Sequence, residues 1–320
     1  MKQRILACLK GIATGDAIGK QTETLSRDGV LRWYPDEVRG FEGPAGTPIP
    51  RYVGNARREW RIGETTDDTE GTIAVARAIL QEGNVHHASV GRELLKCTKS
   101  VHPGVKSLWE FHQAGDPARV TPFHDGCGAA IRVAPVGILY RSHRLDDIVA
   151  GAREASISTH GGALAIAAAA ATAAAVSAAI DGASPLEIIG FAQRAAAQAE
   201  RERSGSGAAP FAKAVRTIHT DVRQWSELRP VEVAARYFPK GPLTIVPLAL
   251  ALGTVLPSAE AAILLATNLG GDSDSVASIA GAILGARCPE TVNDEWYAVV
   301  ERVNGHNLQS LAEDLTRLRR

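Results

Sequence analysis

Two short acidic segments in this 320-residue chain contain the residue types from which divalent-cation sites are built. The first, TTDDTE, spans residues 65–70, and the second, GGDSDS, spans residues 270–275. Each presents at least two carboxylates and a hydroxyl within four residues, just before or at the start of a helical pattern. Oxygen-only clusters of this kind suit hard ions such as Mg²⁺ or Mn²⁺. The pattern therefore indicates metal binding.

Helix capping is the simpler interpretation of each segment taken alone. Ser, Thr and Asp at a helix start accept hydrogen bonds from exposed amides, and carboxylates favour the positive end of the helix dipole. One cap needs only one such residue, whereas carboxylates that are packed together repel each other unless a cation neutralises them. Because the chain contains two such segments, metal binding is favoured over capping.

A third segment, GDAIGKQTE at residues 15–23, carries a glycine pair and a glutamate. It is not the dinucleotide-binding fingerprint, because no strand precedes it. Without a functional role, the segment would be a helix that ends at a glycine and is followed by a turn, and Glu23 would be an ordinary surface carboxylate.

The elements that must position these segments are helices. Apolar residues recur at spacings of three and four along most of the chain, and no period-two run predicts a convincing strand. We therefore expect a single all-α domain over residues 1–320. The predicted helices cover residues 3–18, 69–82, 87–99, 126–139, 145–155, 161–181, 185–201, 208–223, 243–256, 258–268, 275–286, 292–303 and 307–318.

Two stretches are predicted to be loops. Residues 40–64 contain too many Gly and Pro for a regular element, and a loop of this length is usually functional or disordered. Residues 203–209 are predicted to form a surface loop rather than a domain boundary, because the acidic segments lie on both sides of it and one site would need both halves.

Bulk composition excludes several classes of protein. The 35 basic residues balance the 35 acidic ones, so charge indicates neither a nucleic-acid binder nor a membrane-surface protein. The cysteines are far apart and form no metal-binding pair, which favours a reducing cytoplasm. Residues 161–180 carry no charge over the length of a membrane span, but most of them are alanine. We expect a buried core helix there and no membrane association.

Five motifs together resemble the ADP-ribosylglycohydrolase family. They are GDAIGKQTE (15–23), TTDDTE (65–70), DGCGAAIRVAPVG (125–137), STHGGALA (158–165) and GGDSDSVASIAGAILGA (270–286), in the family's order and over nearly the whole chain. The family includes dinitrogenase-reductase-activating glycohydrolases, ADP-ribosylarginine and ADP-ribosylserine hydrolases, and J1-crystallins. The resemblance implies a compact multi-helix domain with two divalent cations, Mg²⁺ or Mn²⁺, in a central cleft.

The resemblance also implies roles for individual residues. By matching position, one metal would be bound by Thr66, Asp67 and Asp68, and the other by Asp272, Asp274 and Ser275, with one carboxylate bridging. The substrate would be contacted by Glu23, by Gly126, Cys127 and Gly128 through backbone amides at the diphosphate, and by His160. Glu23 and the bridging aspartates, Asp67 and Asp68 among them, are the candidates for orienting or deprotonating the attacking water.

Three positions depart from the family pattern. Ser275 stands where a threonine is usual, although the hydroxyl is retained. Cys127 replaces the common asparagine of the glycine-rich turn, and Lys106 lies near the place where some bacterial relatives have a catalytic aspartate. These departures put the target linkage and the catalytic base in doubt.

The function expected from these motifs is hydrolysis of the glycosidic bond between ADP-ribose and an acceptor. The partner would be an ADP-ribosylated protein or a small ADP-ribosyl substrate. One alternative is a non-catalytic relative that binds ADP-ribose or is structural, as a crystallin is. Another is a metal-dependent hydrolase of a different nucleotide sugar, N-glycoside or phosphoester.

Overall fold

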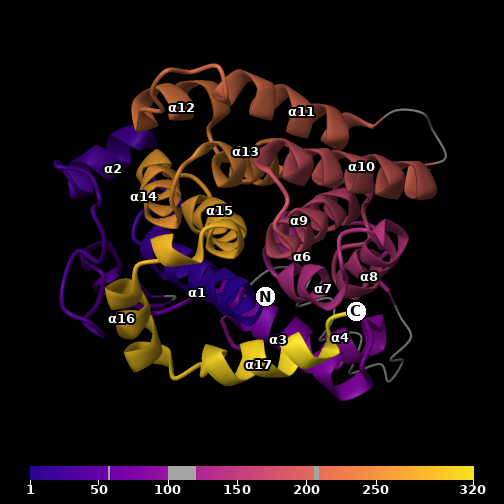
Figure 1. Ribbon diagram of the computed structural model, residues 1–320. Helices are drawn as coiled ribbons and strands as arrows, with labels where there is room; N and C mark the ends of the chain where they lie inside the picture. Colours follow the sequence, from indigo (N-terminus) through magenta and orange to yellow (C-terminus); the bar gives the residue numbers. More distant parts are fainter. Residues whose placement is uncertain (57, 100–119, 205–208) are drawn as a thin grey trace.

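The computed structural model describes residues 1–56, 58–99, 120–204 and 209–320, and these residues form a bundle of helices without a strand (Figure 1). One isolated antiparallel bridge joins Pro48 to Arg61. The all-α prediction is confirmed. The longer helices are α1 (Lys2–Gly19), α3 (Asp67–Glu82), α4 (His87–Leu94), α8 (Leu145–Ile157), α9 (Ala163–Asp181), α10 (Pro185–Ser204), α11 (Pro210–Val222), α13 (Pro242–Val255), α14 (Ala259–Leu269), α15 (Ser273–Arg287), α16 (Asp294–Asn304) and α17 (Leu308–Leu318).

The alanine-rich helix α9 lies at the centre of the bundle. It contacts α6 (Gly128–Ile131), α7 (Ala134–Leu139), α8, α10, α13 and α15. By length and composition it could cross a membrane, but 89% of its most apolar 18-residue stretch is buried inside the fold. Small side chains let several helices approach it at once, which explains why so long a run of alanine is useful in a core. The prediction of a core helix over 161–181 is confirmed.

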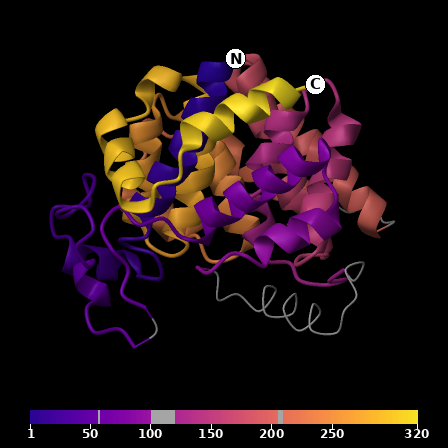
Figure 2. The same ribbon diagram turned by 90° about the horizontal axis from the view of Figure 1, so that it is seen from below.

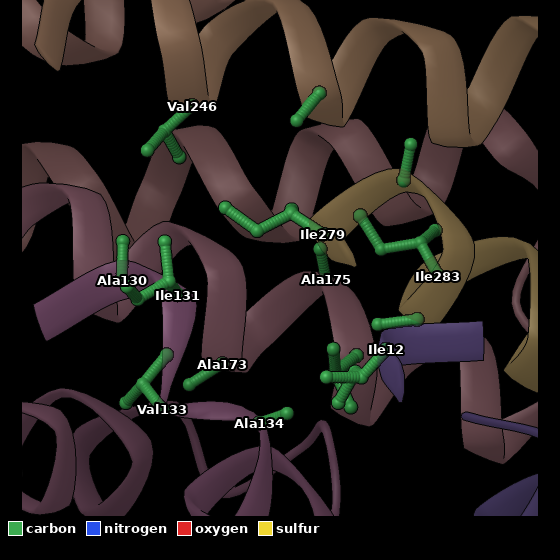
Figure 3. Packing of buried hydrophobic residues seen from close by; sticks show 14 of the residues in the cluster. Ile12, Ala130, Ile131, Val133, Ala134, Ala173, Ala175, Val246, Ile279 and Ile283 are labelled. Carbon is green, nitrogen blue, oxygen red and sulfur yellow. The ribbon is translucent and has the colours of Figure 1, made fainter. Parts of the chain in front are cut away.

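Helices α1 and α15 pack backbone against backbone. A Cβ atom at Gly11 would lie 2.1 Å from the carbonyl oxygen of Gly281, and one at Gly285 would lie 2.2 Å from that of Ala7. Isoleucines fill the space beside this seam, as Figure 3 shows for Ile12 and Ile283. Glycine is therefore required along the seam for steric reasons, because any side chain would push the two helices apart.

The chain between α1 and α3 forms a separate layer at one edge of the bundle (Figure 2). It contains α2 (Arg27–Trp33) and the 3₁₀ turn η1 (Pro50–Tyr52). Four of its side chains form a small apolar cluster of their own: Ile49, Tyr52, Trp60 and Ile62. The predicted loop over 40–64 is thus mostly irregular, but it has its own buried cluster.

The structure differs from the sequence predictions at several short elements. Helices α2 and α12 (Pro230–Tyr237) were not predicted, because seven or eight residues are too few to show a clear helical period. The helix predicted over 126–139 is divided into α6 and α7, where Pro135 begins a new first turn. Helix α4 ends at Leu94 rather than at residue 99. Lys106 lies outside the described residues.

The α1–α15 seam leads to a first prediction. Gly11→Ala should lower the free energy of unfolding by about 2 kcal/mol or more, because the new methyl group meets backbone that cannot move alone. Gly190→Ala in α10 is the matched control, since its Cβ would meet only the flexible end of Arg194 at 3.5 Å. Urea unfolding measures both variants. A Gly11→Ala protein as stable as the wild type would contradict the steric account of the seam.

Candidate metal centre

The first acidic segment forms the start of α3. Thr66 is the N-cap residue, and its hydroxyl accepts a hydrogen bond of 3.3 Å from the backbone N–H of Asp68. Asp67 and Asp68 therefore occupy the first turn, where the partial positive charge of the helix end favours carboxylates. Thr66 alone caps the helix, so capping does not account for the presence of Asp67 and Asp68. The two aspartates remain available for another role.

Asp16 of α1 fixes this helix start from the other side. Its carboxylate accepts hydrogen bonds from the backbone N–H of Thr66 at 2.9 Å and of Thr69 at 3.0 Å, and from the Thr69 hydroxyl at 2.5 Å. The Asp16 side chain is fully buried. Every one of these partners donates to it, so Asp16 orders the start of α3 rather than offering free oxygens.

The second acidic segment forms the start of α15. Gly270 and Gly271 have φ values of 75° and 66°, and a Cβ at either position would clash with a neighbouring backbone oxygen. This turn brings the backbone N–H of Asp272 to 2.9 Å from the carbonyl of Pro239. Asp274 then follows in the first turn of α15 and packs against Gly19. A Cβ atom at Gly19 would lie 2.4 Å from the Cα atom of Asp274. The glycines thus place Asp272 and Asp274 beside the end of α1.

The two helix starts converge. Burial raises the pKa of Asp68 well above its usual value, and the charge of Asp274 is the next largest cause, followed by smaller contributions from other aspartates, Asp272 among them. Burial raises the pKa of Asp67 to about 6, with a further contribution from the charge of Asp16. Contacts between α3 and α15 agree with this convergence. Carboxylates from opposite ends of the sequence therefore share one buried region that lacks enough positive charge.

A lysine supplies part of the missing charge. Lys20, directly after α1, forms an ion pair with Glu23, and its Nζ atom lies 3.9 Å from Oδ2 of Asp274. Its ammonium also lies 4.3 Å from the ring centre of Trp60 in the edge layer. Burial alone would lower the pKa of Lys20, but the charges of Asp274 and then Glu23 outweigh it and raise that pKa.

The glycine-rich turn before α6 forms a neighbouring wall. The Cys127 thiol donates to Oδ2 of Asp272 at 3.2 Å, which links the turn to the acidic cluster of Asp67, Asp68, Asp272 and Asp274, with Glu23 beside it. Gly128 packs against His160, because a Cβ there would lie 2.8 Å from the imidazole. The His160 side chain is buried, and its Nδ1 atom lies 2.7 Å from the Thr159 hydroxyl. Gly126 precedes this turn in the same irregular segment.

The residues present fit a divalent cation. Oδ2 of Asp68 is buried and has no hydrogen-bond partner among the described residues, so it is an oxygen acceptor without a donor. The Ser275 hydroxyl belongs to a buried residue next to Asp274. Within the described ranges, however, no group of three or more His, Cys, Asp or Glu side chains is arranged so that it could hold a metal ion. Two carboxylates, those of Glu23 and Asp274, instead lie beside the Lys20 ammonium.

Two residues of this cluster were missed by the sequence analysis. Asp16 and Lys20 both lie in the GDAIGKQTE segment, where only Glu23 was assigned a role. The available signal for Asp16 was a carboxylate inside an apolar helix, which is uncommon unless the group has partners. No comparable signal existed for Lys20, because a lysine after a helix end is ordinary at a surface.

Comparisons with known proteins agree with the fold. The family model described as ADP-ribosylglycohydrolase matches residues 1–320. An uncharacterized protein of Archaeoglobus fulgidus is 28% identical over 300 residues, which is 90% of this chain and 88% of that protein. The uncharacterized protein YegU of Escherichia coli K12 is 30% identical over 299 residues, 89% of this chain and 87% of that protein. A solved structure titled ADP-ribosylglycohydrolase-related protein complex has a TM-score of 0.74 at 24% identity and covers 99% of this chain and 98% of its own.

The hydrogen bonds of Asp16 lead to a second prediction. In Asp16→Asn an amide NH₂ replaces one acceptor oxygen and faces donors on Thr66 and Thr69, which should cost about 1–3 kcal/mol of stability. Asp294→Asn is the control, because that side chain is 80% exposed. Urea unfolding compares the two. Equal stabilities would show that Asp16 does not order the start of α3.

A third prediction concerns pH. His306 lies 2.8 Å from the Thr65 hydroxyl, and burial, followed by the charge of Lys99, lowers its pKa from 6.5 to about 4. The unfolded chain therefore takes up this proton first, so the stabilising contribution present above pH 6.5 is lost as the pH falls towards 4. In His306→Gln the loss of unfolding free energy between pH 7 and 4.5 should be smaller. His143→Gln, at an exposed site, should keep the wild-type slope, and an unchanged slope in His306→Gln would contradict the assignment.

Proposed function

Because the chain belongs to the ADP-ribosylglycohydrolase family of hydrolases, we propose that it cleaves the glycosidic bond between ADP-ribose and an acceptor. The acceptor is a protein side chain or a small molecule, and the reaction depends on two divalent cations, Mg²⁺ or Mn²⁺. The observation that carries the proposal is the convergence of Asp68 with Asp272 and Asp274, which come from opposite ends of the sequence. Crowding of this kind is unfavourable without cations.

The two helix starts provide the proposed ligands. One ion would be held at the start of α3 by Thr66, Asp67 and Asp68. The other would be held at the start of α15 by Asp272, Asp274 and Ser275. Divalent cations bound there lower the pKa of a water molecule and anchor the ribose hydroxyls. Asp68 and Asp274 are each 3% exposed, so their carboxylates suit the role of ligands better than that of a base in contact with water.

Glu23 is the carboxylate best placed to accept a proton from the attacking water. Its side chain is 25% exposed, so water reaches it. Its carboxylate pairs with the Lys20 ammonium and accepts a hydrogen bond of 3.4 Å at Oε2 from the Tyr52 hydroxyl. Asp67 is half-buried and is the second candidate for this role. Negative charge from the surrounding carboxylates stabilises the positive charge that develops at the anomeric carbon.

The neighbouring walls of the site bind the rest of the substrate. Backbone amides of Gly126, Cys127 and Gly128 hold the diphosphate, because small residues allow its oxygens to approach the chain closely. His160 lines the same side of the site. Tyr52 and Trp60 form the opposite wall, where the edge layer reaches Lys20, and they help to exclude bulk water from the reacting bond.

The product distinguishes this function from its alternatives. Metal-free protein is incubated with arginine- and serine-linked ADP-ribosyl peptides and with small ADP-ribosyl compounds, each with Mg²⁺ or Mn²⁺, and the products are separated by chromatography. Free ADP-ribose is expected from at least one substrate. AMP would indicate pyrophosphate cleavage instead, and binding without turnover would indicate a non-catalytic relative.

The metal ligands are tested with the same assay. Asp67→Ala combined with Asp272→Ala should lower the rate at least about 100-fold, which corresponds to about 2.7 kcal/mol of transition-state stabilisation. Asp294→Ala is the control, because its exposed carboxylate is paired with Lys10 outside the cluster. Its rate should equal that of the wild type. Unchanged hydrolysis by the double variant would rule out the proposed mechanism.

A further inference from the structure

The side chain of Lys20 lies inside the acidic cluster rather than at the surface. It is 8% exposed, although lysine is almost never buried without a partner. Its Nζ atom pairs with Glu23 and lies 3.9 Å from Oδ2 of Asp274. On its other side it faces two aromatic rings, with the centre of Trp60 at 4.3 Å and that of Tyr52 at 5.8 Å.

This position is understandable from the energetics of buried charge. Removing an ammonium from water costs several kcal/mol unless opposite charges compensate. Here two carboxylates compensate, and the aromatic faces add a cation–π attraction. The same ammonium offsets part of the repulsion between Glu23 and Asp274, so the cluster can form before any metal ion binds.

The oxygens that Lys20 occupies are the ones that the proposed function assigns to metal binding and catalysis. Asp274 is a proposed ligand, and Glu23 is the proposed base beside it. An ammonium and a divalent ion that share these carboxylates repel each other strongly in a buried site. By contrast, Oδ2 of Asp68 has no donor among the described residues and is free to accept an ion.

We propose that Lys20 is a resident cation of the acidic cluster, which competes with a divalent ion for Asp274 and Glu23 and so makes the two metal sites unequal. The first ion binds on the Asp68 side of the cluster without displacing anything. The second ion binds on the Asp274 side only when the Lys20 ammonium moves away from Asp274 and Glu23 and closer to the rings of Trp60 and Tyr52, which it already faces. This inference rests on the proposed function, because it assumes the same two metal sites.

The experiment is an equilibrium titration of metal-free protein with Mn²⁺. Free Mn²⁺ is counted by electron paramagnetic resonance, and the heat of binding is measured in parallel. The wild type is expected to bind two ions in two separate steps. In Lys20→Met, which keeps an unbranched side chain only one atom shorter and removes its charge, the second dissociation constant should fall at least about 10-fold, with a smaller change in the first.

Two variants serve as matched controls. Lys20→Arg keeps the positive charge and should retain the two separate steps. Lys10→Met removes a lysine of α1 in a similar setting, because Lys10 pairs with Asp294 at 2.7 Å and lies 4.7 Å from the ring centre of Tyr297. It is outside the cluster, so its Mn²⁺ affinities should equal those of the wild type.

A second measurement needs no change at Lys20 and so does not depend on whether that variant folds. In a titration of the wild type with Mg²⁺, the second binding step should change the fluorescence of Trp60, because the ammonium leaves its contact with Glu23 and Asp274. The change should be absent in Trp60→Phe. A second step without any such change would overturn the proposal.

The remaining outcomes separate this inference from the proposed function. Two equal affinities in the wild type, or a second affinity that Lys20→Met leaves unchanged or weakens, would overturn the role of Lys20 while leaving the metal sites intact. Absence of Mn²⁺ binding in the wild type and in folded Lys20→Met would overturn both the inference and the metal-dependent function.

Discussion

The close approach of α1 and α15 is the constraint on which the rest of the site depends. Gly15 and Gly19 allow the two backbones to touch, and a Cβ at Gly15 would lie 2.4 Å from the carbonyl oxygen of Ala277. These two glycines directly precede Asp16 and Lys20 in the chain, so the seam adjoins the charged groups at the end of α1. Asp16 on α1 and Asp274 on α15 are therefore held at a distance that bulkier residues in the seam would not permit. The apolar packing of the bundle thus determines the spacing of its most polar groups.

The aspartates of the cluster divide into two kinds according to their partners. Asp16 accepts several hydrogen bonds from the start of α3, so its charge is compensated within the protein. Asp68 is equally buried but has an oxygen without a described donor, and its pKa is raised by burial and by its neighbours. A compensated carboxylate orders the structure, whereas an uncompensated one attracts a cation. The hydrogen bonds therefore separate the positioning residue from the proposed ligand, although both are aspartates.

Much of this could be predicted from the sequence, and the rest could not for identifiable reasons. Both acidic segments were recognised, because consecutive carboxylates at helix starts are a local pattern, and the long helices have clear periodicity. Their convergence was only a hypothesis, since it depends on tertiary contacts between α3 and α15. The burial of Lys20 was missed for the same reason: its aromatic partners come from an irregular segment that sequence patterns do not place. The break between α6 and α7 was missed because Pro135 is compatible with a first turn as well as with a kink.

The acidic cluster, which we propose as a site for two divalent cations, must fold before any cation binds, and the structure shows what limits the repulsion between its carboxylates. The starts of α3 and α15 both point at the cluster, and each helix end contributes a partial positive charge of about half an elementary charge. The Lys20 ammonium contributes a full positive charge from the end of α1. These charges are fixed by the backbone or by burial, so they act without any ligand. Compensation remains incomplete, since the pKa values of Asp68 and Asp274 are still raised by burial and by neighbouring carboxylates. The residual negative charge would favour cation binding, so the stability that the cluster costs the free protein would also be the source of the proposed affinity for metal ions.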